Sequence, residues 1–137
     1  MVEWVCPECR RVFGRRKQSH ECAPAMTLDE YFSTGPARER PIFEAVKAHL
    51  DTVGPVHVEP VSVGIFIKRG RTFVELRPMQ KWVALSFVLP RSVDHSRITR
   101  RIGSGGRTFH FVRLYGPEDV DHDVCAWLTE SYLDSSP

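Results

Sequence analysis

The hydrophobic pattern of the chain changes its period at Gly54, and this change constrains the fold more than any other feature of the sequence. In residues 40–53, apolar side chains recur at helical spacing, among them Phe43, Val46 and Leu50. Beyond Gly54 the period becomes two, in segments rich in β-branched and aromatic residues. These segments are residues 61–68, 72–77 and 82–89. The sequence therefore predicts a helix followed by paired strands.

Weaker signals complete the expected domain. The stretch from Thr27 to Glu30 has the form of a capping box, which predicts a short helix there. Residues 108–115 alternate as a last strand would, and apolar side chains around Trp127 indicate a C-terminal helix. Residues 92–102 are expected to be irregular or briefly helical. We predict an α+β fold in which helices cover one face of an antiparallel, four- or five-stranded meander sheet.

The first 22 residues contain four potential metal ligands: Cys6, Cys9, His20 and Cys22. No apolar run is long enough to span a bilayer and no signal peptide is recognisable, so we expect a cytoplasmic protein that does not enter a membrane. Because thiols stay reduced in the cytosol, metal binding is favoured over disulfides. Three Cys and one His suit tetrahedral Zn²⁺, and four protein ligands leave no position for water, so the zinc is expected to be structural. We predict a zinc finger in residues 1–25 and an α+β domain in residues 26–137.

The spacing within the finger predicts its local shape. His20 and Cys22 are two residues apart, so they point the same way only if the backbone is extended or tightly turned. The finger is therefore expected to consist of a knuckle and a turn, without a long recognition helix. Its motif resembles the Cys-Cys-His-Cys class of small zinc fingers, although that class usually has several residues between its last two ligands. The matching positions are Cys6, Cys9, Arg11, Phe13, His20 and Cys22.

The rest of the chain, residues 28–133, resembles an uncharacterised bacterial domain family that is loosely described as transport-protein-like. The similarity lies in the order of the elements and in the stretches 64–68 and 73–78. This resemblance implies a fold and no established activity.

Charge is strongly segregated along the chain. Residues 68–113 contain eleven Lys and Arg against two Asp and Glu, whereas residues 114–137 contain none against six. One interpretation is that these segments neutralise one another across the fold. The other is that a basic face binds an anionic partner.

Two groups of residues are candidates for contact with such a partner. The finger loop offers Arg10, Arg11, Arg15, Arg16 and Lys17 around Phe13, whose ring we expect to form the finger's small core. Strand alternation places a second group on the sheet face opposite the helices, and an open face of this kind binds single-stranded RNA in several proteins. This group is Lys68, Phe73, Arg77 and Trp82. Alternatively, the finger or a second subunit covers this face.

These features favour a zinc-binding, non-catalytic module that binds nucleic acid or another anionic partner. Two alternatives remain: an adaptor that docks another protein through the aromatic sheet face, and a small-ligand protein or enzyme with an unrecognised pocket. The sequence shows no convincing catalytic set, because His122 and Cys125 lack any feature that would activate the thiol. The glycine-rich stretch 103–106 precedes a strand and lacks the Lys of a phosphate loop.

Overall fold

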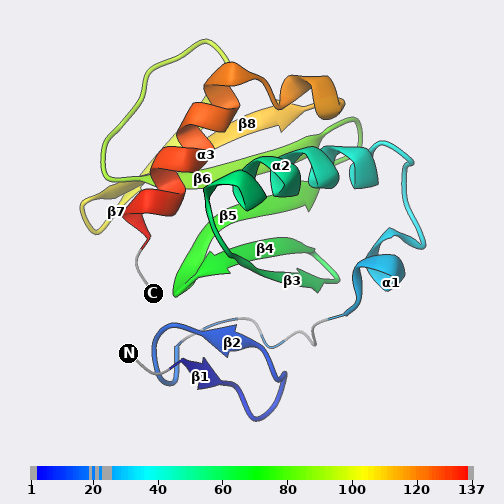
Figure 1. The fold of residues 1–137 in the computed structure, drawn as a ribbon, viewed down its shortest axis with the longest axis vertical. Helices are drawn as coiled ribbons and strands as arrows, with labels where there is room; N and C mark the ends of the chain where they lie inside the picture. The colour runs from blue at the N-terminus through cyan, green and yellow to red at the C-terminus, as the bar shows by residue number, and fades with distance from the viewer. Residues whose placement is uncertain (1–2, 19, 21, 23–25, 136–137) are drawn as a thin grey trace.

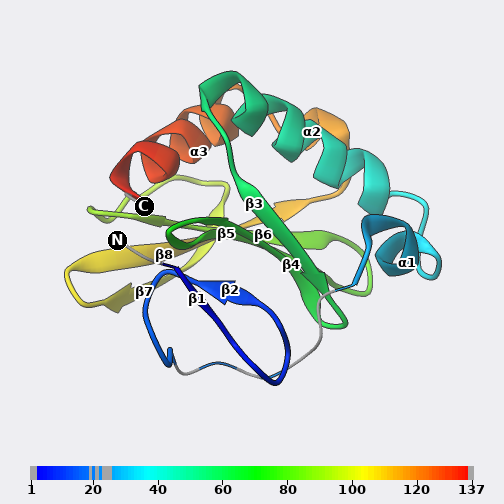
Figure 2. The same cartoon turned by 60° about the horizontal axis from the view of Figure 1, so that its bottom comes forward.

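The structure is a computed structural model, and it describes residues 3–18, 20, 22 and 26–135. Its main body is a six-stranded antiparallel sheet with two helices on one face and a small N-terminal hairpin on the other. Figure 2 shows these three layers from the side, with α2 and α3 above the sheet and β1 and β2 below it. The fold is α+β, as predicted.

The elements follow one another in the order helices, strands, helix, after the N-terminal hairpin. The hairpin consists of β1 (Trp4–Val5) and β2 (Val12–Phe13), and the first helices are α1 (Leu28–Phe32) and α2 (Glu39–Val53). The sheet contains β3 (His57–Val61), β4 (Gly64–Arg69), β5 (Arg71–Pro78), β6 (Val83–Leu89), β7 (Ile98–Ser104) and β8 (Arg107–Leu114). A 3₁₀ turn, η1 (Pro117–Asp119), leads into α3 (His122–Asp134).

The sheet is larger than the sequence predicted and is not a simple meander. Its order is β3-β4-β5-β6-β8-β7, so β8 lies between β6 and β7. The expectation that residues 92–102 are irregular or helical is wrong for β7, which pairs with β8 from Ile98 to Ser104. This strand forms the edge of the sheet and buries none of its side chains, so it lacks the apolar alternation that reveals a strand.

The hydrophobic core lies between the sheet and the helices α2 and α3. On α2, Ile42, Val46 and Leu50 are completely buried, which confirms the helical period of this segment. On α3, Leu128 is completely buried, and the Ser131 hydroxyl donates to the Val88 carbonyl of β6 at 2.6 Å. The helices are therefore fixed to the sheet by apolar packing and by a buried hydrogen bond.

A bulge between β4 and β5 overturns one sequence-based assignment. Ile67 pairs with Val74, but the next residue, Lys68, pairs with Thr72, so Phe73 is an extra residue in β5. Its ring is 2% exposed and lies 5.8 Å from the ring of Tyr132 on α3. The prediction that Phe73 lies on the face opposite the helices is wrong, because simple alternation does not continue through a bulge.

Much of the segregated charge is neutralised within the fold. Four arginines of the basic segment form ion pairs with acidic residues of the C-terminal segment, as the first interpretation of the charge pattern predicts. The pairs are Arg71 and Arg107 with Asp134, Arg91 with Glu130, and Arg97 with Asp121. Surface pairs of this kind contribute about 0–1 kcal/mol each.

A buried histidine gives the fold a specific dependence on pH. His110 is completely buried, and its ring stacks on Phe87 at 5.4 Å. Its Nε2 accepts a hydrogen bond from the Val93 N–H at 2.9 Å, so a neutral ring carries its proton on Nδ1. Burial is the main cause that lowers the pKa of His110. The unfolded chain therefore binds more protons than the native protein below the ordinary histidine pKa.

We predict that the free energy of unfolding falls as the pH drops below about 6.5, and continues to fall until the pH reaches the lowered pKa of His110. His110→Phe keeps the ring but not the ionisable group, so this variant should lose part of the slope. Urea unfolding between pH 8 and pH 5 measures this pH dependence in the wild-type protein and in the variant. His122→Gln, at an exposed position, is the control and should keep the wild-type slope. An unchanged slope in His110→Phe would contradict the assignment.

Candidate metal centre and the uncovered sheet face

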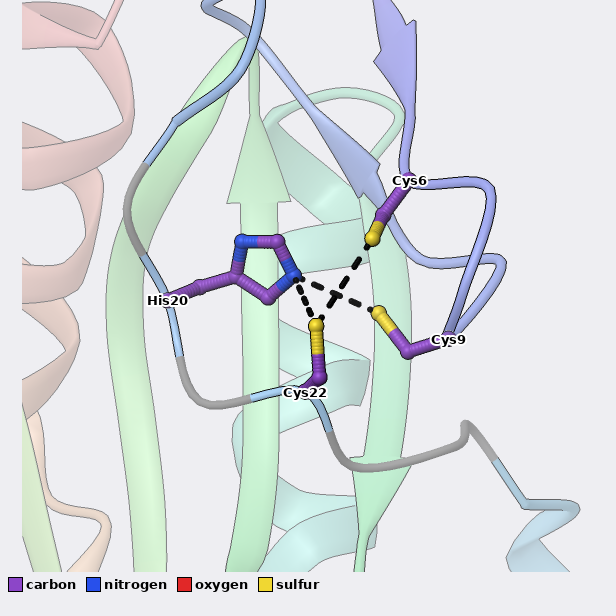
Figure 3. Close-up of side chains that lie close together, drawn as sticks. All are labelled: Cys6, Cys9, His20 and Cys22. Atoms are coloured by element: carbon purple, nitrogen blue, oxygen red, sulfur yellow. Dashed lines mark hydrogen bonds between the residues drawn. The ribbon is translucent and has the colours of Figure 1, made fainter.

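The first two candidate ligands lie on a tight knuckle between β1 and β2. The Arg10 N–H donates to the Cys6 carbonyl at 2.8 Å, and the Cys6 N–H donates to the Arg11 carbonyl at 2.9 Å. Arg10 has a φ of 64°, in the left-handed region that closes such a turn. The knuckle directs the sulfurs of Cys6 and Cys9 to the same side, as Figure 3 shows.

The second pair of candidate ligands meets the first, so the structure brings together all four residues that the sequence singled out. Their donor atoms lie within 4.8 Å of one another, and these four residues could hold a metal ion. Cys6 Sγ lies 3.8 Å from Cys22 Sγ, and His20 Nε2 lies 3.4 Å from Cys9 Sγ and 3.2 Å from Cys22 Sγ. A tetrahedral zinc ion has bonds of about 2.3 Å to sulfur and 2.0–2.1 Å to nitrogen. Two sulfur ligands of such an ion lie about 3.8 Å apart, and a sulfur and a nitrogen ligand lie about 3.6 Å apart, close to the distances found here.

The imidazole of His20 is oriented for metal binding by its surroundings. Its Nδ1 donates to the Gln18 carbonyl at 2.6 Å, which leaves Nε2 unprotonated and facing the thiols. The ring packs on Phe13 with 4.1 Å between centroids. Phe13 is 4% exposed, so it forms the finger's core, as expected. Among the described residues before α1, no helix is present, in agreement with the predicted knuckle and turn.

The thiols in this cluster strongly influence one another. A hydrogen bond from the Cys9 backbone N–H is the main cause that lowers the pKa of Cys6 to about 6. Desolvation of its sulfur, followed by the interaction with Cys6, raises the pKa of Cys22 to about 12, although the residue as a whole is exposed. Three sulfurs at these distances repel one another as thiolates. A divalent cation between them would remove this repulsion, which is why the donor set suits a metal.

The finger is joined to the sheet by a group of buried charges, which we call the Glu59 cluster: Glu59, Arg11, Lys68 and the backbone of Val12. Glu59 Oε1 lies 3.0 Å from Arg11 Nε and 2.8 Å from Lys68 Nζ. Glu59 Oε2 accepts from the Val12 N–H at 2.9 Å, and Lys68 Nζ donates to the Val12 carbonyl at 2.6 Å. The three charged side chains are at most 5% exposed. Strands β3 and β4 thus hold β2 through charge-assisted hydrogen bonds.

The Glu59 cluster also involves the aromatic rings between the two layers. Lys68 Nζ lies 3.8 Å from the centroid of Phe13, and the Arg11 guanidinium lies 4.8 Å from that of Phe66 on β4. Arg11 and Lys68, which were candidates for contact with a partner, are therefore buried and occupied within the chain. The sequence could not show this, because it does not reveal that the finger folds back onto the sheet.

A close backbone contact completes the junction. Gly14 follows β2 and packs against Gly70 in the β4–β5 turn, where a Cβ on Gly14 would overlap the Gly70 carbonyl oxygen. A side chain at position 14 would push the finger off the sheet. This glycine therefore has a packing role that the sequence analysis did not identify.

The finger covers only part of the sheet, and the remainder of that side is rich in aromatic rings and arginines. Strand register places Arg77, Ala84 and Arg113 in one row across β5, β6 and β8, and Arg100 beside Phe111. We call this region the uncovered face. It comprises Arg77, Trp82, Arg100, Phe109, Phe111 and Arg113.

Two arginines of the uncovered face lie over aromatic rings. The Arg113 guanidinium lies 4.2 Å from the centroid of Trp82, and that of Arg100 lies 5.6 Å from Phe111. Arg77 forms an ion pair with Glu75. Sequence analysis identified Arg77 and Trp82 but missed the other members. The alternation of β8 could have revealed Phe109, Phe111 and Arg113, whereas Arg100 lies on the unrecognised edge strand.

A groove of about 440 Å³ separates the finger from the uncovered face. The finger contributes Phe13, Gln18 and His20 to its walls, and the sheet contributes Phe66 and Phe109, among others. The finger loop cations Arg10, Arg15, Arg16 and Lys17 are all exposed.

The body of the chain matches a known family. The model of a domain of unknown function, DUF5655, covers residues 28–135, which is most of the chain. The protein belongs to the DUF5655 family. No curated protein and no solved structure matches it. Within the described residues, none of the helices has the length and apolar character needed to cross a membrane. The four candidate metal ligands precede the matched DUF5655 region.

The Glu59 cluster lies where the DUF5655 domain meets the finger, and its charges depend on one another. Burial alone would raise the pKa of Glu59, but hydrogen bonds from Lys68, the Val12 N–H and Arg11 together lower it. Burial lowers the pKa of Lys68, and Glu59 opposes this effect. The carboxylate therefore offsets the cost of burying two cations.

We predict that Glu59→Gln lowers the free energy of unfolding by about 3–5 kcal/mol, because it leaves Arg11 and Lys68 buried without a counter-charge. Denaturant unfolding followed by circular dichroism measures the change. Glu44→Gln removes a carboxylate that is 62% exposed and pairs with Arg40 on α2, so it should cost less than about 1 kcal/mol. Equal losses in the two variants would show that the Glu59 cluster does not hold the finger.

Proposed function

We propose that this DUF5655 protein is a zinc-stabilised, non-catalytic module that binds single-stranded nucleic acid across the uncovered face and the adjoining finger loop. The observation that carries the proposal is the pairing of arginines with aromatic rings on a sheet face that the finger leaves open.

The donor set supports zinc as the metal. Three thiolates and one imidazole in a tetrahedral arrangement are typical of structural zinc sites and unsuited to magnesium or calcium. Four protein ligands would complete the coordination shell, so the ion would have a structural role. The finger is small, with a core of Phe13 and Trp4 next to the cysteines, so the metal would supply much of its folding free energy.

Two of the three arginines of the uncovered face differ from those on the opposite side of the domain, whereas Arg77 pairs with Glu75. Arg91 and Arg97 form ion pairs with α3 and the residue before it, whereas Arg100 and Arg113 have no carboxylate partner among the described residues. A guanidinium over an aromatic ring is restrained by the cation–π interaction, and its N–H groups remain available for a base or a phosphate. Stacking and phosphate contacts of this kind bind single strands with little sequence preference.

The finger loop extends this basic surface. Its exposed cations are Arg10, Arg15, Arg16 and Lys17. The same loop continues to Gln18 and His20, which line the groove beside the uncovered face. A single nucleic-acid strand bound on the sheet could therefore continue along the finger, where the cations of the finger loop would neutralise its phosphates.

A second candidate function is that of a protein-docking adaptor. Its support is the exposed apolar area at the same face, where Ile102 is 39% exposed, Phe109 is 38% exposed and Tyr115 is 53% exposed. Apolar patches of this kind are common in protein interfaces. The arginines of this face favour nucleic acid over a protein partner, because they can bind phosphates. A titration with single-stranded nucleic acid separates the two functions.

We predict near-stoichiometric zinc in protein purified without chelator, measured by elemental analysis. The double variant Cys9→Ser/Cys22→Ser removes two thiolate ligands and should lose the zinc. Cys125→Ser, on α3 and outside the cluster, should retain it. Full zinc occupancy in the double variant would refute the assignment of these ligands.

We predict that a fluorescent single-stranded homopolymer binds at low salt and that Arg100→Gln/Arg113→Gln weakens this binding. Removing two phosphate contacts should reduce the slope of log K against log salt by about 1.4. Fluorescence anisotropy at several salt concentrations measures both quantities. The triple variant Arg15→Ala/Arg16→Ala/Lys17→Ala should also weaken binding, and it should reduce the slope by the amount expected for the loss of up to about three phosphate contacts.

The control for charge is Arg91→Gln/Arg97→Gln, which removes two arginines that already form ion pairs. This variant should bind as the wild type does. Equal weakening by the control would mean that net charge alone drives binding. If the wild-type protein binds neither single- nor double-stranded nucleic acid at low salt, the nucleic-acid proposal fails and the adaptor function takes its place.

A further inference from the structure

A second groove is lined by residues of α1 and of the segment that follows it. Helix α1 lies at the side of the sheet in Figures 1 and 2. The groove has a volume of about 510 Å³, within the range of small-molecule sites. One wall is formed by Tyr31 of α1 and by Pro36, and the other by Met79 and Gln80 in the β5–β6 turn. Glu39, the first residue of α2, also lines it.

Glu39 is a largely buried residue whose carboxylate oxygens stay accessible from the groove. The residue is 8% exposed, yet its side chain forms no hydrogen bond or ion pair with any residue that the structure describes; its backbone N–H donates to the Pro36 carbonyl at 3.3 Å. Its oxygens point towards Gly35 in the groove wall, where a Cβ would lie 3.3 Å from Oε2. Burial is the main cause that raises the pKa of Glu39, and the charge of Arg38 opposes it only in part. A buried polar group of this kind normally has a partner, because desolvation without one is costly.

Neither neighbouring charged side chain bonds to the Glu39 carboxylate among the described residues, although the Nε of Arg38 is buried without a hydrogen-bond partner. Arg38 donates from one terminal nitrogen to the carbonyls of Met79 and Gln80, at 3.3 Å and 2.9 Å. This contact holds the β5–β6 turn against the start of α2 and fixes the second wall of the groove. Glu30, the other acid in the lining, accepts from the Thr27 N–H at 3.1 Å in the capping box of α1. The N-terminus of α2 favours an acid at position 39, but a helix end does not require that the carboxylate be buried.

We propose that this groove binds a small organic cation, whose ammonium group donates to Glu39 and whose apolar part packs on Tyr31 and Met79. An ammonium here would supply the missing partner of a desolvated carboxylate and would lie beside an aromatic ring. The apolar part would contact Pro36 and Pro78, which also line the groove. Below Glu39 the lining continues into the core at Phe32 and Phe43. This site is independent of the metal ligands and of the uncovered face.

The test is a titration with benzylammonium, followed by the amide signals of isotope-labelled full-length protein in NMR spectra. We expect saturable shifts at Tyr31, Gly35 and Gln80. Benzyl alcohol has a similar shape without the charge and should bind about tenfold or more weakly, as should benzylammonium with Glu39→Gln. Glu39→Gln removes an unpaired buried charge and should fold at least as stably as the wild type. Glu39→Asp keeps the charge and should retain measurable binding.

Glu44→Gln, which changes an exposed acid of the same helix, is the matched control and should leave the affinity unchanged. Three results would each overturn the proposal: no saturable shifts with benzylammonium at about 10 mM, equal affinity for benzyl alcohol, or unchanged affinity in Glu39→Gln. The last two would indicate an apolar groove in which Glu39 takes no part.

Discussion

The arrangement of this protein depends on the carboxylate of Glu59, which binds both layers of the structure at once. It receives hydrogen bonds from Arg11 and the Val12 backbone of the finger, and from Lys68 of the sheet. Three buried charges are stable only as a group, because any one left alone would be desolvated without compensation. The finger has too small a core to hold its own position. Its place on the sheet therefore follows from this cluster, and its internal shape from the four candidate metal ligands.

The position of the finger decides which surface remains for other molecules. It buries Lys68 and packs on Phe66, but leaves the aromatic and basic rows of β6, β8 and β7 open. The acidic C-terminal segment neutralises arginines elsewhere on the domain, so the net charge of +2 conceals a local concentration of cations. The uncovered face is thus what remains after internal pairing. For this reason Arg100 and Arg113, which form no ion pair with a described residue, are better candidates for contact with an external partner than the basic segment as a whole.

Glu59 and Glu39 show how the environment gives the same type of side chain two different roles. Both are almost fully buried, at 2% and 8% exposure. Glu59 has two cations and a backbone donor, and its pKa is lowered despite burial. Glu39 has no such side-chain donors among the residues that the structure describes, and its pKa is raised. The first carboxylate is satisfied and holds the architecture together. The second lines a groove and has no side-chain partner in the described part of the chain, which is why we propose it as the contact for a cationic ligand.

The sequence by itself determined the parts that depend on local pattern. The change of period at Gly54 predicted α2 and the α+β class. The spacing of Cys6, Cys9, His20 and Cys22 predicted the cluster. Both predictions were possible because helical repeats and knuckle motifs depend on residues that are close together in the sequence. Only the tertiary structure decided the rest. The edge strand β7 shows no alternation of buried and exposed side chains, so its sequence does not indicate a strand. The bulge at Phe73 changes the face of the sheet on which this side chain lies. Arg11 and Glu59 lie 48 residues apart and meet only because the finger folds back onto the sheet. Burial and charge pairing across that distance are properties of the packed chain, and no local pattern records them.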